Sequence, residues 1–292
     1  MRRRRIDGGR YAAAALCGCG LLATLLAATV SAAPAAAFAD PQSPGVGAWE
    51  YLQPQLYGDR PIGYVDEKFM SMQAPTNTQD PAMTPVSLRF GPGAVGNIKQ
   101  IRVIIDNNPI PLAATFNLAP GAPIAAIDLR VRIDRFTSVR AIAETTTGRL
   151  EMRSVWVQAS GGCSAASGAA SAGKPGEIRF RPSPDDKSLQ VSIRHPNNSG
   201  FQIDPRTGNP IRQFYITHIG LRAGGQPLLE ADTGVSIAEN PTLRIVADRR
   251  LPTPVTVAAI DSDGGHYAAT WDGTSSHGDV AANGAAGAAR AP

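Results

Sequence analysis

The sequence contains little cysteine, few aromatic residues and no long helical pattern. Its 292 residues include three cysteines, and 6% of them are aromatic. No Cys or His residues are spaced as a metal site requires, and no motif places a base beside a nucleophile. No stretch shows sustained helical periodicity. These absences argue against a metal centre, a bound cofactor, an autonomous enzyme and a helical fold.

The first 39 residues have the pattern of a secretory signal peptide. Residues 2–5 are all arginine, and residues 11–30 consist mainly of Ala and Leu. Small residues follow, so we expect cleavage after Ala39, with Ala33 as the second candidate. A membrane anchor is the alternative, but two glycines interrupt the apolar run and its end is rich in alanine. We therefore expect export to the periplasm and no membrane association after cleavage.

Loss of this segment would change both the charge and the cysteine content. The whole chain has 28 Lys+Arg and 24 Asp+Glu, but residues 1–39 hold five Arg and one Asp, so 23 of each sign remain. Without a basic excess, nucleic acid is not expected as a partner. Cys17 and Cys19 also leave; a lipoprotein site at Cys19 is disfavoured because the apolar run before it is short. Cys163 remains alone, and a lone thiol in an oxidising compartment needs an outside partner or a role.

Two series of short strands are predicted between the many Gly and Pro residues. In residues 127–134 (IDLRVRID) apolar and charged residues alternate, as in a strand with one core face and one wet face. Similar runs occupy residues 85–158 and again 189–271. The fold class is therefore all-β, with one antiparallel β-sandwich over residues 40–160 and a second over 177–272.

The segment between these domains has a different composition. Residues 161–176 are mostly Gly, Ala and Ser, with no large apolar side chain, which predicts a flexible linker. Cys163 lies on this linker, and Gly161, Gly162 and Ser164 are expected to form a flexible arm around it. A mobile thiol should keep its ordinary pKa. The alternative without a functional role is a linker that happens to contain a cysteine. Residues 273–292 are expected to be a disordered tail.

Other motifs favour structural interpretations. Residues 91–96 satisfy G-x-G-x-x-G, but a strand rather than a helix follows, so a turn is favoured over a phosphate site. Residues 261–264 (DSDG) resemble the start of a calcium loop, yet a later carboxylate is missing and a hairpin turn is favoured. His195 precedes a proline at a strand end and is expected to be structural, while His277 falls in the tail.

Several segments resemble the SoxY and SoxZ subunits of the SoxYZ sulfur carrier family. The SoxY-like segments are residues 108–116 (NPIPLAATF), 130–132 (RVR), 139–144 (VRAIAE) and 157–163 (VQASGGC). The SoxZ-like segments are residues 193–196 (IRHP), 199–200 (SG), 204–211 (DPRTGNPI) and 238–241 (AENP). The resemblance extends over residues 85–270 in the order SoxY, then SoxZ.

This resemblance implies a fold, a role and partners. It implies immunoglobulin-like sandwiches and a cysteine, here Cys163, that carries sulfur intermediates between periplasmic enzymes, among them a haem cytochrome and a hydrolase. The fused layout is similar to SoxYZ-like carriers associated with quinoprotein dehydrogenases, which weakens the case for thiosulfate as cargo. One departure is clear: the SoxY cysteine is followed by glycine near a chain end, whereas Ser164 and a linker follow Cys163.

Two hypotheses therefore remain. In the first, Cys163 holds a sulfur-containing intermediate covalently and presents it to separate enzymes. In the second, the protein is a non-covalent accessory module for a periplasmic quinoprotein dehydrogenase, and Cys163 is incidental. Neither hypothesis requires a metal or a cofactor on this chain.

Overall fold

The structure is a computed structural model that describes residues 46–166, 168, 173–274 and 280–282. All of them belong to one compact unit, Ala39–Pro292. The predicted signal peptide and His277 lie outside the described residues. Within the part that is described, no helix has both the length and the apolar character needed to cross a membrane.

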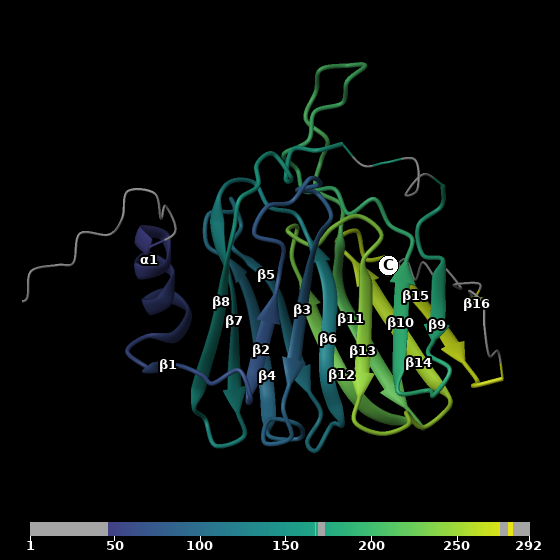
Figure 1. The fold of residues 1–292 in the computed structure, drawn as a ribbon. Coiled ribbons are helices and arrows are strands. Elements are labelled where there is room, and N and C mark those ends of the chain that lie inside the picture. Colours follow the sequence, from purple (N-terminus) through teal and green to yellow (C-terminus); the bar gives the residue numbers. More distant parts are fainter. Residues whose placement is uncertain (1–45, 167, 169–172, 275–279, 283–292) are drawn as a thin grey trace, which may run out of the picture. The chain divides into compact units, whose positions relative to one another are not determined.

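The described strands form two sheets, which confirms the all-β prediction (Figure 1). The nine-stranded sheet has the order β1 (Ile62–Tyr64), β8 (Leu150–Val157), β7 (Thr137–Thr145), β4 (Ile98–Ile105), β5 (Leu112–Leu118), β12 (Gln226–Thr233), β11 (Ile216–Ala223), β14 (Val255–Asp261) and β15 (His266–Trp271). The seven-stranded sheet has the order β16 (Val280–Ala282), β9 (Ile178–Pro182), β10 (Ser188–Ile193), β13 (Thr242–Ala247), β6 (Ile124–Val131), β3 (Thr84–Phe90) and β2 (Met70–Gln73).

Each sheet runs through both halves of the chain. Strand β5 of the first half pairs antiparallel with β12 of the second, with Phe116 opposite Ala231. In the other sheet β6 pairs antiparallel with β13, and Ile127 lies opposite Ile245. A single apolar core cluster contains residues from both halves. Besides the predicted linker, the two halves are therefore joined by hydrogen bonds between their strands.

Periodicity of two explains which side chains form the core. In β6, Ile127, Leu129 and Val131 are buried, whereas Asp128 is half-buried and Arg130 is exposed. Alternate side chains of a strand point to opposite faces, so the apolar set of each sheet faces the opposite sheet. The sequence pattern predicted this strand correctly as far as Val131, where β6 ends.

Helix α1 (Val46–Tyr57) and strands β1, β2 and β16 were not predicted. The helix contains Pro54 and has no acidic residue in its first turn, so its sequence carries no clear helical signal. It packs through Trp49 and Tyr57 against Ile104 and Ile142. Strand β16 pairs with β9 inside the stretch expected to be a disordered tail. Tertiary pairing and packing, rather than local propensity, account for these elements.

Candidate functional site

Cys163 lies in a turn that follows β8, and its side chain is buried. Only 1% of the residue is exposed, and it is a free cysteine. The residue is held against the protein by both halves of the chain. The expectation of a solvent-exposed thiol is therefore wrong for Cys163 in this structure, whereas the mobility of the arm stays a prediction. Part of the predicted linker, residues 167 and 169–172, lies outside the described residues.

The two glycines before Cys163 allow the turn to dock. The Gly161 N–H donates to the Asp134 carbonyl at 2.7 Å, and the Gly162 N–H donates to the Ile133 carbonyl at 2.9 Å. Gly161 has a φ of +80°, which suits glycine. A Cβ on Gly162 would lie 2.2 Å from the Pro81 carbonyl oxygen and 2.5 Å from that of Ile133. In this conformation the two glycines allow close approach, and the flexible arm stays a prediction.

Ser164 closes the turn on its outer side. The residue is exposed, and its Oγ donates to the Gly161 carbonyl at 3.1 Å. The Ala165 N–H donates to the same carbonyl at 3.0 Å. Ser164 therefore belongs to a hydrogen-bonded turn, and its exposed side chain offers a matched control for substitutions of its buried neighbour Cys163.

The second half of the chain also contacts this turn. The Ser199 Oγ donates a short hydrogen bond to the Cys163 carbonyl. Ser199 is fully buried, and its own N–H donates to the Gln202 Oε1 at 2.8 Å. Because Ser199 belongs to the loop after β10, the cysteine turn is held between residues far apart in the sequence. The sequence drew attention to Ser199 through the SoxZ-like segment but gave no indication of this contact.

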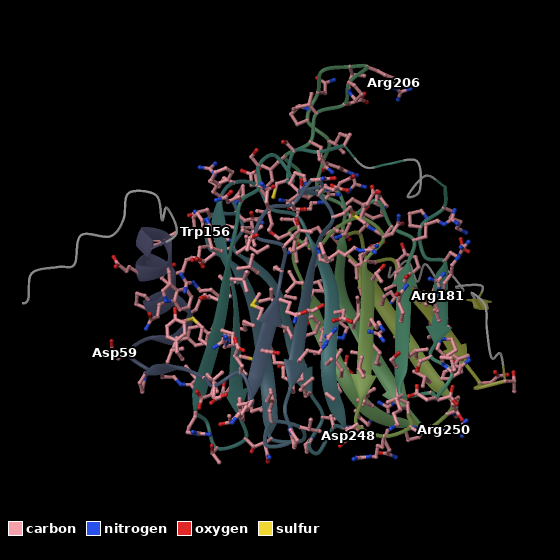
Figure 2. The ribbon with its side chains drawn as sticks, in the orientation of Figure 1. Asp59, Trp156, Arg181, Arg206, Asp248 and Arg250 are labelled. Atoms are coloured by element: carbon pink, nitrogen blue, oxygen red, sulfur yellow. The ribbon has the colours of Figure 1, made fainter. Side chains whose placement is uncertain are left out.

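The same loop continues into an exposed extension. Ile203 and Pro210 form an isolated β-bridge, and the Asp204 N–H donates to the Asn209 carbonyl at 2.9 Å. Figure 2 shows Arg206 at the tip of this extension, away from the sheets. Ile203 is 52% exposed, which is high for a large apolar side chain. The loop therefore joins the buried contact with Cys163 to an exposed surface.

Arg132 lies beneath the cysteine turn and is fully buried. The alternating pattern placed it on the wet face, but β6 ends at Val131, and the Arg132 N–H donates to the Ser236 carbonyl at 2.7 Å instead. Its Nη1 donates to the carbonyls of Gly162 at 3.2 Å and Ala165 at 3.4 Å. Its Nε and Nη2 have no hydrogen-bond partner among the described residues. Burial lowers the pKa of Arg132, and the nearby charges of Glu239, Cys163 and Asp80 oppose that shift.

Asn108 fixes the backbone that supports this arginine. Its Nδ2 donates to the Arg132 carbonyl at 2.7 Å and to the Ser236 Oγ at 3.0 Å. Its Oδ1 accepts from the Asp134 N–H at 2.9 Å. The sequence could not reveal that this side chain is buried and spans two backbone segments.

Burial keeps the Cys163 thiol in its neutral form in this position. Burial raises the pKa of Cys163 to about 12; the charge of Asp134 raises it further, and Arg132 opposes the shift. The expectation of an ordinary pKa is therefore wrong, because it assumed a solvated thiol. The thiolate is the nucleophile in sulfur chemistry, so this buried position disfavours reaction of Cys163.

His195 occupies a structural position, as predicted. It is fully buried beside Phe214, and its Nδ1 accepts from the Asn197 N–H at 3.0 Å. Burial lowers the pKa of His195 to about 4, although Asp261, with its Oδ2 3.8 Å from Nε2, opposes the shift. Asp261 also accepts from the Gly265 N–H at 2.7 Å, which confirms the hairpin turn at residues 261–264.

Neither the glycine-rich motif nor the described side chains that could bind a metal form a second candidate site. Residues 91–96 form turns that lead directly into β4, as predicted for a motif without a phosphate-binding helix. Among the described residues, no group of three or more His, Cys, Asp or Glu side chains could hold a metal ion.

Two family models match the two halves of the chain. Residues 53–163 match sulfur oxidation protein SoxY, and residues 181–272 match sulphur oxidation protein SoxZ. The SoxY match ends at Cys163 itself. Among curated proteins, none matches the sequence.

Two solved structures are similar to parts of the chain. The sulfur carrier protein SoxY from Chlorobium limicola f thiosulfatophilum is 18% identical, with 38% of this chain and 96% of that chain covered and a TM-score of 0.32. A superoxide reductase (neelaredoxin) from Ignicoccus hospitalis is 14% identical, with 31% and 79% covered and a TM-score of 0.28. Scores this low carry no argument about function.

Proposed function

Because one polypeptide carries a SoxY domain followed by a SoxZ domain, we propose that it holds a sulfur intermediate covalently on Cys163. SoxY and SoxZ are sulfur carrier proteins without catalytic activity, which confirms the prediction that the chain is not an enzyme. The observation that carries the proposal is the position of Cys163 at the end of the SoxY match, in a turn clamped by the SoxZ half.

The carrier role requires the turn to alternate between a docked and a released position. The docked turn is held by a few hydrogen bonds, each contributing roughly 0.5–1.5 kcal/mol. A partner enzyme that binds the released turn can offset a cost of this size. In water the thiol regains a lower pKa and becomes available as thiolate.

Loading is an oxidation that this chain does not perform alone. Joining the Cys163 thiol to a second thiol-level sulfur forms one S–S bond and releases two protons and two electrons. The electrons pass to a redox partner, for which a haem cytochrome is the candidate, and a hydrolase would later remove the oxidised end of the cargo. We place this cycle in the periplasm, after removal of residues 1–39.

The alternative function is an accessory module of a quinoprotein dehydrogenase system in which Cys163 is incidental. The burial of the thiol and its raised pKa favour this alternative, since an inert core cysteine would have the same properties. Under this alternative the docked turn is a permanent part of the fold, and no released position is needed.

The deciding experiment uses protein isolated from the periplasm of the organism that encodes it, grown on reduced sulfur compounds. Intact-mass and peptide analysis should find an adduct on Cys163 that a reductant removes. Free thiol alone, or only irreversible oxidation, would contradict the carrier role. A Cys163→Ser strain should grow poorly on the substrate, whereas the adjacent, exposed control Ser164→Ala should not. Undiminished growth of Cys163→Ser would favour the accessory module.

A further inference from the structure

The guanidinium of Arg132 has more donors than acceptors in the docked structure. Arg132 is fully buried, yet no residue in the described part of the chain forms a hydrogen bond with its Nε or Nη2. Its Nη1 bonds are long, at 3.2 and 3.4 Å, and both go to carbonyls of the cysteine turn. An uncompensated buried charge is costly, so an anion brought against the Arg132 guanidinium would be bound favourably.

Among the residues that the structure describes, no carboxylate forms an ion pair with Arg132. Glu239 and Asp80 act on it only through space, and the Glu239 Oε2 accepts from the Gly168 N–H at 2.6 Å. The Arg132 guanidinium acts to lower the pKa of Cys163, and the charge of a Cys163 thiolate would act to raise the pKa of Arg132. A neutral thiol cannot supply the missing negative charge, whereas an anionic group attached to that sulfur can.

We propose that Arg132 is the receptor for an anionic group joined to Cys163, so that the turn, lifted to admit a conjugate, is held in place by oxyanion-bearing conjugates and not by neutral or cationic ones. A guanidinium offers a planar fork of N–H donors that matches sulfonate or carboxylate oxygens. This inference rests on the proposed carrier role, because it concerns the group that Cys163 holds.

Loading also explains how the donors of Arg132 become free. Cys163 has almost no exposed surface, so a conjugate on its sulfur fits only if the turn lifts. Lifting withdraws the Gly162 and Ala165 carbonyls from Nη1, and the oxygens of an anionic conjugate then take their place. A conjugate without such oxygens leaves Arg132 with fewer hydrogen-bond acceptors than in the docked turn. Arg132 then does not hold the lifted turn in place.

The test compares conjugates of similar size and opposite charge on the full chain carrying Cys17→Ser and Cys19→Ser. Cys163 is treated with the 2-sulfonatoethyl or the 2-(trimethylammonium)ethyl ester of methanethiosulfonic acid. In both reactions the thiolate attacks the sulfenyl sulfur, forms one S–S bond and expels methanesulfinate, so no other oxidant is needed. Intact mass confirms a single label. The rate at which dithiothreitol removes the label is measured for the folded protein and for the protein unfolded in urea. The ratio of these two rates gives the protection of each conjugate.

The sulfonate conjugate should be protected about tenfold or more over the cationic one, as for a charged hydrogen-bonded pair. Arg132→Gln should abolish this difference, and Arg132→Lys should retain part of it. Equal protection of both conjugates in the parent chain would overturn the proposal, even if Arg132→Gln does not fold. So would a difference that survives in a folded Arg132→Gln protein. The carrier role is tested separately, by the adduct on Cys163 in protein from its native periplasm. If that adduct is absent, a measured preference of Arg132 for the anionic conjugate still stands. If the adduct is present but the two conjugates are equally protected, the proposal about Arg132 still fails.

Discussion

A single glycine controls how closely the cysteine turn approaches the rest of the protein. A methyl group at Gly162 would overlap the carbonyl oxygens of Pro81 and Ile133. Forcing an extra carbon into such a contact costs about 1–3 kcal/mol. We therefore expect Gly162→Ala to favour the released turn and to raise the rate of Cys163 alkylation by iodoacetamide about tenfold or more. The rate is followed at pH 8 by intact mass.

The matched control for this change is Gly93→Ala. Gly93 has open space around its Cα and no positive φ, so its substitution should leave the alkylation rate unchanged. Equal rates for the parent chain and Gly162→Ala would mean that the turn is not released as a unit, and would count against the docked and released positions.

The sequence revealed the residues of the site better than their environment. Cys163 was predicted as the attachment point, and that role stays a prediction. The sequence did not predict the burial of Cys163, because a run of Gly, Ala and Ser has the composition of a linker. That composition is the same whether the glycines permit motion or allow close approach. Arg132 was placed on the wet face because a period of two was extended past the end of β6. Where a strand ends depends on its pairing, which local pattern does not contain.

At the level of elements, helix α1 depends on one aromatic residue. The Trp49 ring lies 4.6 Å from the Arg140 guanidinium, which also bonds both carboxylate oxygens of Asp106 at 2.9 Å. Truncating a buried tryptophan costs roughly 3–5 kcal/mol, so Trp49→Ala should expose α1 to hydrogen exchange and lower the melting temperature. Tyr51→Ala on the same helix, where Tyr51 is 70% exposed, should do neither. Similar exchange in both variants would show that Trp49 does not anchor the helix.

The loop after β10 should make stability depend on pH through His195. Its folded-state pKa is about 4, below its ordinary value of 6.5, so between these pH values the unfolded chain binds a proton that the folded chain does not. Stability is therefore lost as the pH falls from 6.5 towards 4, by roughly 3 kcal/mol in all. Urea unfolding at several pH values should give a shallower dependence for His195→Gln than for the parent chain.

His218 provides a control of opposite sign. Burial opposes its protonation, but the carboxylates of Asp232 and Glu230, at 2.8 and 2.9 Å, raise its pKa overall. A raised histidine pKa gives stability that is present at low pH and lost as the pH rises. His218→Gln should therefore steepen the loss of stability towards acid, whereas His195→Gln reduces it. A shift in the same direction for both variants would contradict the assignment.

For the whole molecule, the sequence predicted sandwiches but not the way in which they join. Alternation in residues 127–131 was enough to identify a strand with one buried face. Which strand of the other half lies beside it is a question of long-range register, and Ile127 opposite Ile245 could not be inferred from either segment alone. The linker composition suggested independence, whereas the shared sheets and core make the halves a single folding unit.

This joint core predicts that the covalent connection between the halves is dispensable after folding. A protease site inserted after Ala170 and cut in the folded protein should yield two pieces that elute together in size-exclusion chromatography. They should also unfold in one transition, because β5 pairs with β12 and β6 pairs with β13. Pieces that separate after cleavage would mean that the paired strands contribute little to association.

A pair of substitutions tests whether those strands are the cause. Ala231 on β12 is fully buried opposite Phe116 on β5. Ala231→Arg therefore places a charge between the paired strands of the two halves and should let the cut pieces separate. Ala268 on β15 is exposed, so Ala268→Arg should leave the cut protein intact. If the paired strands hold the cut pieces together as expected, the two halves of the fused chain assemble as two separate chains could. The covalent connection between the halves then chiefly keeps the Ser199 loop beside the Cys163 turn.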